Sequence, residues 1–394
     1  MLTPGKPSIA GTAVIVGAGV GGLAAALVLR RAGWTVRVLE RSSSIDQAGF
    51  GLSLAPNALA ALRELGVVES IVREGHVPKI VEIRHTDGTL VRRIAADAFS
   101  RPGDPAMVLV RRSILHKCLL NAIGSGCIAF DCDVTSFRIE HDGVSIATAD
   151  NRTFDADLLI GADGVGSIVR RTLHPSEAAP RFSGYWALRG LATGAGDHLG
   201  GVSAIAYLGP GAEAAAIRAG EDVVYWYASL AQTHVGDGTA DARALLDRCA
   251  ALQHPTFRAI ARSSGPDGMR LEPLFVRDPL LSWGVGPVTL LGDAAHPVLP
   301  HTGQGAALAL EDALALGLAL SREPSPVALR RYESVRRRRT DRVIRSGPRI
   351  ARVTTTSSPV VGSVRNAFIR MMPVSAAATV FRVLPRRDPH RELR

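Results

Sequence analysis

The hexapeptide GAGVGG at residues 17–22 constrains the fold of this chain more than any other stretch. A short apolar run at residues 12–16 precedes it, and a helical pattern and a second apolar run, residues 35–39, follow it. Glycines spaced in this way make a tight turn, let a pyrophosphate approach the backbone and let the helix pack closely on the first strand. We therefore predict a strand–helix–strand unit of a parallel sheet, with an adenine dinucleotide at the N-terminus of the helix. The residues predicted to contact it are Gly17, Ala18, Gly19, Val20, Gly21 and Gly22.

An acidic residue closes the second apolar run. Glu40 stands 18 residues after Gly22, where a carboxylate accepts hydrogen bonds from the ribose hydroxyls of a bound dinucleotide. Arg41 follows, and the sequence leaves open whether it covers the adenine or is solvated. NAD and FAD both fit this pattern, so the choice between them depends on the rest of the chain.

Length and composition indicate an ordered, two-domain α/β protein. The chain has 394 residues, 46% of them hydrophobic, and 40 glycines. No apolar run reaches the ~18–20 residues that a membrane-spanning helix needs, and the N-terminal apolar segment leads into the glycine fingerprint rather than into a cleavage site. We expect a cytoplasmic protein with no membrane partner. The four cysteines lack metal-site spacing, so we expect free thiols and no metal.

The positive charge of the chain raises the question of a nucleic-acid partner. The formal net charge is +10, and the arginines are densest after Arg330, on a pattern that predicts a helix with one apolar face. Because neither an aromatic RNA-binding motif nor zinc-finger spacing accompanies them, we expect no nucleic-acid partner. A solvated helix face and a surface that attracts anions or a partner both remain open.

A second glycine-rich stretch, GDAAHPVLPHTGQGAALALED, occupies residues 292–312. Gly-Gln-Gly at its centre opens a helical pattern over residues 306–320. The unpaired N–H groups and the positive dipole end of such a helix favour negative charge on a bound group, such as the N1/C2=O edge of a reduced flavin. The carboxylate of Asp293 suits the hydroxyls of a ribityl chain. A plain strand, turn and buried helix would fit the same letters.

Two segments interrupt these motifs with alternating, strand-like runs. Residues 78–103 contain an Asp-Gly turn between two such runs, which predicts an antiparallel hairpin. Residues 177–277 contain several more, and an antiparallel sheet of this kind has one face free to cover a ligand. Core packing is the alternative role for each aromatic residue there. The candidates for substrate contact are Arg189, Tyr207, Tyr225, Trp226 and Tyr227.

Two further positions are candidates for the dinucleotide site. Asp163 lies in DLLIGADGVGSIVR at residues 157–170, where an apolar strand meets a Gly/Asp-rich turn, and a structural Asx-turn is the alternative. Arg112 precedes a predicted helix, residues 113–122. Its guanidinium could hydrogen-bond a pyrophosphate or the ribityl region, or could be solvated.

Together these stretches resemble the single-component FAD-dependent aromatic hydroxylases, the para-hydroxybenzoate hydroxylase family. The resemblance covers about residues 10–345, and its two later motifs are specific to this group. Four matches carry it: GAGVGG with Glu40, Arg112 ahead of Leu115 and Leu119, DLLIGADGVGSIVR at 157–170, and GDAAHPVLPHTGQGAALALEDA at 292–313.

The resemblance implies an α/β fold in which a Rossmann-type FAD-binding domain with a parallel sheet is interleaved with an antiparallel β-sheet substrate domain. C-terminal helices complete the fold. The expected segments are 1–77, 104–176 and 278–330 for the FAD-binding domain, 78–103 and 177–277 for the substrate domain, and 331–394 for the helices.

The resemblance also implies roles for individual residues. Glu40 is expected at the adenosine ribose, Arg112 at the pyrophosphate or ribityl region, and Asp163 on the dinucleotide side. Asp293 is expected to hold the ribityl and pyrophosphate groups, and Pro300 to face the isoalloxazine ring. Ala307 stands where relatives often carry Asn. The remaining cofactor contacts expected are Arg41, Gly292, Gly303, Gln304, Gly305 and Ala306.

The activity implied is that of a monooxygenase. FAD would be bound tightly but not covalently, NADH or NADPH would reduce it and leave, and O2 would form a flavin C4a-hydroperoxide that hydroxylates a phenolic or polyketide-like aromatic molecule. His301 and Pro300 are the catalytic candidates, because an imidazole near neutral pKa could deprotonate a phenol or bind a carboxylate. A loop hydrogen bond is the alternative for His301, and a structural role is expected for His296.

Other functions remain open at this stage. A reductase or dehydrogenase of the same fold would never insert oxygen, and epoxidising or Baeyer–Villiger relatives use the same apparatus. A basic nucleic-acid-binding or scaffold protein with a vestigial fingerprint is a remote alternative. The substrate and the oligomeric state, monomer or homodimer, cannot be read from the sequence.

Overall fold

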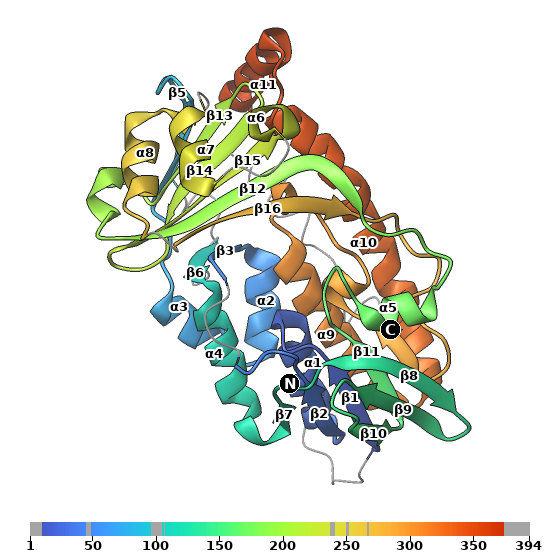
Figure 1. Ribbon diagram of the computed structural model, residues 1–394. Coiled ribbons are helices and arrows are strands. Elements are labelled where there is room, and N and C mark those ends of the chain that lie inside the picture. Colours follow the sequence, from blue (N-terminus) through green and yellow to red (C-terminus); the bar gives the residue numbers. More distant parts are fainter. Residues whose placement is uncertain are drawn as a thin grey trace.

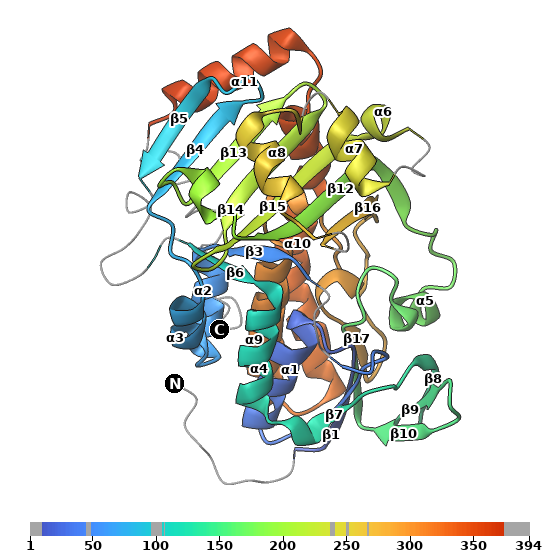
Figure 2. The same ribbon diagram turned by 60° about the vertical axis from the view of Figure 1, so that its left-hand side comes forward.

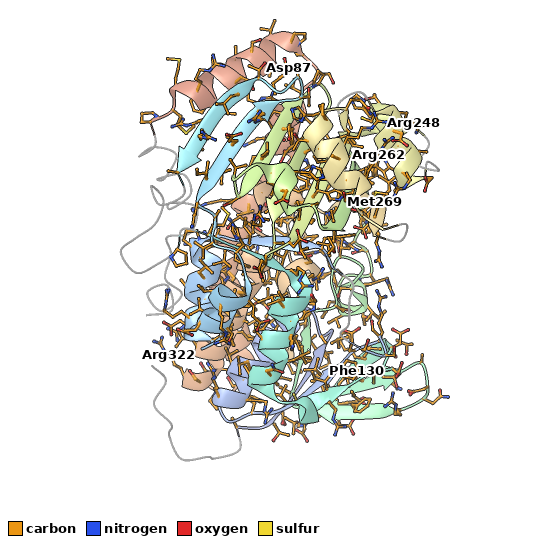
Figure 3. The ribbon with its side chains drawn as sticks, turned by 90° about the vertical axis from the view of Figure 1, so that its left-hand side faces the viewer. Asp87, Phe130, Arg248, Arg262, Met269 and Arg322 are labelled. Carbon is orange, nitrogen blue, oxygen red and sulfur yellow. The ribbon has the colours of Figure 1, made fainter. Side chains whose placement is uncertain are left out.

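The computed structural model describes residues 10–44, 49–95, 105, 107–236, 241–249, 252–265 and 268–373. Two sheets divide the molecule into two halves (Figure 1). Figure 3 shows the same division from the side, with Met269 and Arg262 in the half that holds the larger sheet and Phe130 and Arg322 in the other half.

The smaller of these two sheets is parallel and has five strands, as the glycine fingerprint predicts. Its order is β17-β11-β1-β2-β7, and every neighbouring pair is parallel. The helix α1 (Val20–Arg31) connects β1 to β2 and packs against α4 (Arg112–Ile123) and α9 (Gly305–Arg322). The strands are β1 (Thr12–Val16), β2 (Thr35–Leu39), β7 (Ile128–Ala129), β11 (Leu158–Gly161) and β17 (Val288–Leu290).

The larger sheet has seven strands in the order β16-β12-β15-β14-β13-β4-β5. All neighbours are antiparallel except β13 and β4, which are parallel, so the predicted antiparallel sheet is in fact mixed. Both interrupting segments contribute strands to it; residues 96–103 of the first lie outside the described residues. The strands are β4 (Ile80–His85), β5 (Leu90–Ala95), β12 (Arg181–Thr193), β13 (Ala204–Gly209), β14 (Ala212–Arg218), β15 (Val223–Ala231) and β16 (Met269–Val276).

The two faces of the larger sheet have different partners. The helices α7 (Ala242–Arg248) and α8 (Pro255–Arg262) cover the outer face, where they form a separate hydrophobic core with alternate residues of the strands (Figure 2). The inner face is directed toward the half of the molecule that contains the parallel sheet. The short pair β3 (Gly51–Leu54) and β6 (Val108–Arg111) lies between the two halves.

Smaller elements complete the fold. A three-stranded meander extends from the five-stranded half, and two C-terminal helices run back along the molecule to the larger sheet (Figure 1). The remaining elements are α2 (Pro56–Glu64), α3 (Val68–Glu74), β8 (Val134–Glu140), β9 (Gly143–Thr148), β10 (Thr153–Ala156), α5 (Ile168–Leu173), α6 (Gln232–Val235), α10 (Pro326–Thr354) and α11 (Pro359–Met371). Residues 374–394 of the predicted C-terminal helical segment lie outside the described residues.

Candidate active site

The predicted cofactor motifs meet around one cavity of about 830 Å³, a volume within the range of ligand sites. Motif residues on its wall are Gly17, Gly19, Val20, Gly21, Glu40, Arg41, Arg112, Asp163, Gly292, Asp293, Gly305 and Ala306. Residues that no motif indicated also line it, among them Leu52, Cys132, Asp133, Val134, Thr135 and Arg171. These side chains come from strand ends and loops whose place depends on the fold, so the sequence carried no local signal for them.

The glycine fingerprint has the geometry that its spacing predicts. Gly17 has a φ of +99°, and a Cβ there would lie 2.6 Å from the carbonyl oxygen of Ala162. A Cβ on Gly22 would lie 2.0 Å from the carbonyl oxygen of Gly17, so only glycine allows α1 to pack this closely. At Gly19 a Cβ would meet no described atom within 4 Å, because this residue faces the cavity.

Glu40 is fixed by backbone donors at the cavity wall. Its Oε2 accepts a hydrogen bond from the N–H of Ala18 at 2.7 Å, and its Oε1 accepts one from the N–H of Ser42 at 2.9 Å. The carboxylate is therefore held in one orientation beside the glycine loop. Ala18 itself does not line the cavity, and its N–H is already used by Glu40, so its predicted direct contact with the dinucleotide is corrected to a supporting one. Gly22 is likewise absent from the wall, because it packs on Gly17.

Asp163 combines a structural bond with an unused acceptor. Its Oδ2 accepts hydrogen bonds from the N–H groups of Ile168 at 2.8 Å and Val169 at 3.3 Å, at the start of α5. Within the described residues its buried Oδ1 has no hydrogen-bond partner. Burial raises the pKa of Asp163, although the hydrogen bonds from Ser167 and the backbone oppose this. The geometry is therefore compatible with both interpretations of Asp163: Oδ2 closes the turn, and Oδ1 is available to a bound dinucleotide.

Asp293 lies in the turn after β17 and opens onto the cavity. Its side chain is exposed within this cavity. Burial raises the pKa of Asp293, against the opposing charges of His296 and Arg112. The neighbouring Gly305 begins α9, where a Cβ would lie 3.9 Å from Asp293 Oδ1. The turn and the helix N-terminus therefore form one wall.

A buried charge cluster supports this wall from behind. Asp312 accepts hydrogen bonds from the backbone N–H of Gly292 at 3.1 Å, from His296 Nε2, and from Arg336 Nε at 2.6 Å. Burial opposes ionisation, but the charges of His296 and Arg336 outweigh it and lower the pKa of Asp312 to about 2. Arg336, only 1% exposed, also donates to Glu311 Oε2 at 2.8 Å. His296 is thus part of a buried support and does not line the cavity.

The cluster continues to the start of α9. Glu311 Oε1 accepts from Asn57 Nδ2 at 2.7 Å, and the same amide donates to Gln304 Oε1 at 3.0 Å. Arg339 donates two further bonds to Glu311, at 2.6 and 2.8 Å. Gln304 is therefore a buried support of the helix N-terminus. Its side chain is used by Asn57, and its predicted contact with the cofactor stays a prediction.

Two other predicted ring contacts are also off the cavity wall. Pro300 begins a short 3₁₀ turn and is exposed, and Gly303 ends that turn with a φ of +61°. The cavity wall resumes at Gly305. Gly303 serves the turn that directs the chain into α9, so its role follows from its backbone conformation.

One arginine with a supporting role escaped the sequence analysis. Arg170 is fully buried and donates hydrogen bonds to the carbonyl oxygens of Ala294 at 3.0 Å and Ala295 at 2.9 Å. Glu177 pairs with the same guanidinium. Arg170 thereby ties the Asp293 turn to α5. The only sequence signal for Arg170 was its place at the end of the DLLIGADGVGSIVR motif.

His301 joins the 3₁₀ turn to the inner face of the larger sheet. Its Nε2 lies 2.7 Å from Ser229 Oγ on β15, and its ring packs edge-on against Tyr185 on β12, with centroids 5.5 Å apart. Burial lowers the pKa of His301, with smaller opposing and reinforcing effects from Glu213 and Arg189. Its Nδ1 has no hydrogen-bond partner in the part of the chain that the structure describes.

The strand register separates the predicted substrate residues into two groups. Arg189, Tyr225 and Tyr227 lie on the inner face: Tyr225 stacks on Phe50 with centroids 6.3 Å apart and on Tyr227 at 5.9 Å. A Cβ on Gly51 would lie 2.5 Å from Tyr225, while the next residue, Leu52, lines the cavity. The inner face therefore adjoins the cavity through β3.

Tyr207 and Trp226 belong to the opposite face and are removed from the substrate set. Both are at most 1% exposed and lie in the outer core, packed on Phe257. Trp226 Nε1 donates to Ser264 Oγ at 2.7 Å, so its polar atom is also used there. Consecutive residues of a strand point to opposite faces, so residues 225–227 could not all face one ligand.

Glu213 on β14 is an inner-face residue that the sequence analysis missed. It lies directly opposite Ser229 in the β14–β15 register, and its Oε1 accepts a hydrogen bond from the Tyr227 hydroxyl at 3.0 Å. Its Oε2 is buried and lacks a partner among the described side chains and backbone. Burial, and then the Glu213 carboxyl, raise the pKa of Tyr227 well above its usual range, so the hydroxyl stays protonated. Only the strand pairing could bring Glu213 beside Ser229 and His301.

Neither a metal-binding cluster nor a membrane-spanning helix is present among the described residues. The described residues hold no group of three or more His, Cys, Asp or Glu side chains arranged to bind a metal ion. In the same part of the chain, no helix has both the length and the apolar character needed to cross a membrane.

Comparison with known proteins identifies relatives over most of the chain. The family described as FAD binding domain matches residues 11–199 and 275–346, which is more than half of the chain. The chain is 33% identical over 363 residues to a Stigmatella aurantiaca protein named aurachin C monooxygenase/isomerase, covering 92% of this chain and 94% of that one. It is 32% identical over 355 residues to 3-hydroxybenzoate 6-hydroxylase of Polaromonas naphthalenivorans (strain CJ2), covering 86% and 87%.

A solved structure confirms the fold. Klebsiella pneumoniae HpxO, complexed with FAD and uric acid, superposes with a TM-score of 0.88 over 98% of each chain, at 24% identity. The motifs at residues 17–22, 157–170 and 292–313, the matching family and these relatives agree. The chain therefore belongs to the family of single-component FAD-dependent aromatic hydroxylases, and it is an FAD-dependent monooxygenase.

Proposed function

We propose that this enzyme hydroxylates an aromatic substrate that donates a hydrogen bond, such as a phenol or a heteroaromatic N–H compound. The observation that carries the proposal is a pair of buried polar atoms without partners in the described structure, Glu213 Oε2 and His301 Nδ1, the second of which is an acceptor when Nε2–H donates to Ser229 Oγ. Both lie on or against the inner face of the seven-stranded sheet. Buried polar atoms are costly to leave unpaired, so a bound donor would stabilise them.

The cavity fits FAD on several independent points. Gly19 leaves room for a phosphate group, Asp163 Oδ1 is a buried acceptor without a partner in the described chain, and Glu40 presents a fixed carboxylate beside them. The start of α9 at Gly305 supplies unpaired N–H groups and a positive dipole end. We propose that Glu40 binds the adenosine ribose, Arg112 the pyrophosphate and Asp293 the ribityl chain. The ring system would then lie against residues 305–306.

FAD, reduced by NADH or NADPH, supplies the activation of O2 and the transfer of one oxygen atom to the substrate. The protein's own residues orient the substrate and control protons. Because burial lowers the pKa of His301, its imidazole is neutral near pH 7 and can accept a proton from a substrate hydroxyl. Ser229 holds the other ring nitrogen at 2.7 Å and so fixes the orientation of the ring.

The inner-face aromatics would hold the substrate ring. Tyr225 and Tyr227 stack on each other beside β3, whose residue Leu52 lines the cavity. A flat substrate ring placed there would face both the tyrosines and the N-terminus of α9. The names of the two sequence relatives, one for an aurachin and one for 3-hydroxybenzoate, support an aromatic substrate. Epoxidation and Baeyer–Villiger insertion use the same apparatus and would appear as different products.

The experiment is an oxidation screen with NADH and with NADPH against phenols, N–H heteroaromatics, aromatic acids, polycyclic quinones and their O- or N-methylated analogues. Hydrogen peroxide is measured in parallel, and labelled O2 identifies the inserted atom. We expect donors to stimulate oxidation without peroxide and to gain one labelled oxygen, whereas methylated analogues should not. Equal turnover of methylated and free substrates would contradict the role of the two acceptors, and a reduced product without labelled oxygen would indicate a reductase.

We also propose that the enzyme acts in the cytoplasm, as a monomer or homodimer, and without a nucleic-acid partner. The cysteines Cys118 and Cys132 are free and buried, which fits a reducing compartment. Light scattering of the purified protein tests the assembly. Activity that follows the cytosolic fraction of cells tests the location.

A further inference from the structure

The C-terminal helix α11 turns an apolar stripe toward solvent. Val360, Val364, Phe368 and Met371 are 72%, 65%, 63% and 80% exposed. Their spacing places them on one side of the helix. A helix packed on a protein normally has the reverse arrangement, with its apolar side buried, so a contiguous exposed stripe marks an interaction surface.

The opposite side of α11 is fixed to the body of the protein. Arg365 is 8% exposed, and its guanidinium donates to the carbonyl oxygens of Val353 at 3.2 Å and Thr354 at 2.8 Å. Arg92 on β5 donates to the carbonyl oxygens of Ile369, at 2.6 Å, and Met372 at the C-terminal end of α11. These bonds hold the helix across the edge of the larger sheet that β5 forms (Figure 2). The exposed side chains of the stripe lie on its solvent side.

The charged side chains near the stripe are mostly arginines, with Asp87 in the turn of the β4–β5 hairpin as an acidic exception (Figure 3). Residues 342–373, the last part of the chain that the structure describes, contain six arginines and no aspartate or glutamate. Arg342, Arg345, Arg349, Arg352 and Arg370 are exposed on α10 and α11. On the hairpin beneath α11, Glu82 is neutralised by Arg84 and Arg93. An apolar stripe flanked by cations matches a surface that is apolar inside and anionic outside.

We propose that α11 docks in the plane of an anionic lipid membrane, with its stripe at the acyl boundary and the arginines at the phosphate groups. Amphipathic helices with basic flanks bind membranes in this way. A second copy of the chain fits less well, because four side chains form a small contact and a net charge of +10 opposes self-association. The contact is peripheral, and it revises the expectation that the protein has no membrane partner.

The test is co-sedimentation of full-length holoenzyme with vesicles of phosphatidylcholine, with and without phosphatidylglycerol. The variant is Val364→Ser/Phe368→Ser/Met371→Ser. A matched control, Leu281→Ser/Val327→Ser, removes exposed apolar groups elsewhere, at residues 89% and 63% exposed. We expect roughly tenfold tighter binding to the anionic vesicles, about a tenfold loss in the triple variant, and no change in the control. Turnover without vesicles should be equal in all three proteins.

Three results would overturn the proposal. They are an absence of binding by the full chain, equal binding to neutral and anionic vesicles, and a triple variant that binds like the wild type. Light scattering adds a separate arm: a dimer in the wild type that dissociates in the triple variant would assign the stripe to a second copy. Because turnover is measured separately, a failure here leaves the proposed activity intact.

Discussion

The two halves of the molecule build their parts of the site in different ways. Around the cavity, backbone groups determine the shape of the site. Glycines allow segments of the chain to approach one another closely, and the N–H groups of Ala18 and Ser42 fix the carboxylate of Glu40. On the seven-stranded sheet, side chains determine the shape of the site. Tyr227 and Glu213 come into contact only because two strands pair in one register. The first arrangement is specified by neighbours in sequence and the second by neighbours in space.

The contrast explains what each half can vary. A site built from backbone groups suits a cofactor that is the same for every substrate, and most substitutions in such a site disturb the fold. Side chains at alternate strand positions can be exchanged without moving the strand, so they can adapt to different substrates. The following predictions test this division, beginning with the largest expected effect.

Loss of Arg336 should damage the support of the cavity most severely. Arg336→Met removes the buried cation that Asp312 and Glu311 share and leaves them only His296 and Arg339, which should lower the free energy of unfolding by about 3–5 kcal/mol. Urea unfolding measures the change. Arg338→Met, at an exposed position on the same helix, is the control and should cost less than about 0.5 kcal/mol. Equal stability of the two variants would show that the buried cluster does not hold this half together.

The glycine loop should distinguish a packing role from a binding role. Gly22→Ala brings a methyl group against the Gly17 carbonyl and should cost about 3 kcal/mol. Gly19→Ala meets no described atom, so its thermal unfolding as apoprotein should be unchanged while its FAD affinity falls. Calorimetry and FAD titration separate the two effects. If the Gly19→Ala protein bound FAD like the wild type, the phosphates of FAD would not lie at this residue.

The glycine loop belongs to the part of the fold and of the site that can be predicted from the sequence. The parallel sheet, α1, α9 and twelve cavity residues follow from local motifs, because turn chemistry is set by residues a few positions apart. The support cluster could not be predicted, since Arg336 and Asp312 are 24 residues apart in sequence and lie on different helices. The substrate face could not be predicted either: choosing between Trp226 and Tyr227 requires knowing which side of β15 is covered by α8.

In the other half, His301→Ala should act on chemistry and not on cofactor binding. We expect about a hundredfold slower hydroxylation with normal FAD content, because the base for the substrate hydroxyl is lost. The measurement is turnover with a stimulating phenol, with peroxide release assayed alongside. Ser229→Ala should cause a smaller loss through the same imidazole. Wild-type turnover in His301→Ala would remove this residue from the mechanism.

Two carboxylates, Asp293 on the cavity wall and Asp312 buried behind it, should respond oppositely to pH. The pKa of Asp312 is about 2 in the folded protein against a usual 3.8, so its contribution of about 2 kcal/mol is present above about pH 4 and is lost as the pH falls toward 2. The raised pKa of Asp293 works the other way, since stability of the apoprotein falls as pH rises through it. Urea unfolding from pH 2 to 7 should show a flatter acid limb in Asp312→Asn. An unchanged acid limb would contradict the ion pairing.

The smallest effect should come from a single inner-face hydroxyl. Tyr227→Phe removes the donor to Glu213 and should change the KM for a phenolic substrate about tenfold, with FAD binding unaffected. Tyr207→Phe removes a hydroxyl on the outer face and should leave KM unchanged. Steady-state kinetics of the pair measure which face meets the substrate. Equal changes in both variants would contradict the assignment of faces.

The most direct test is a crystal structure of the enzyme with FAD and a stimulating phenol. We expect the isoalloxazine ring at the start of α9, the phosphates at Gly19, and the phenol between the ring and the face that carries Tyr227, His301 and Glu213. A ring bound away from Gly305, or a phenol bound on the side of Trp226, would contradict the account.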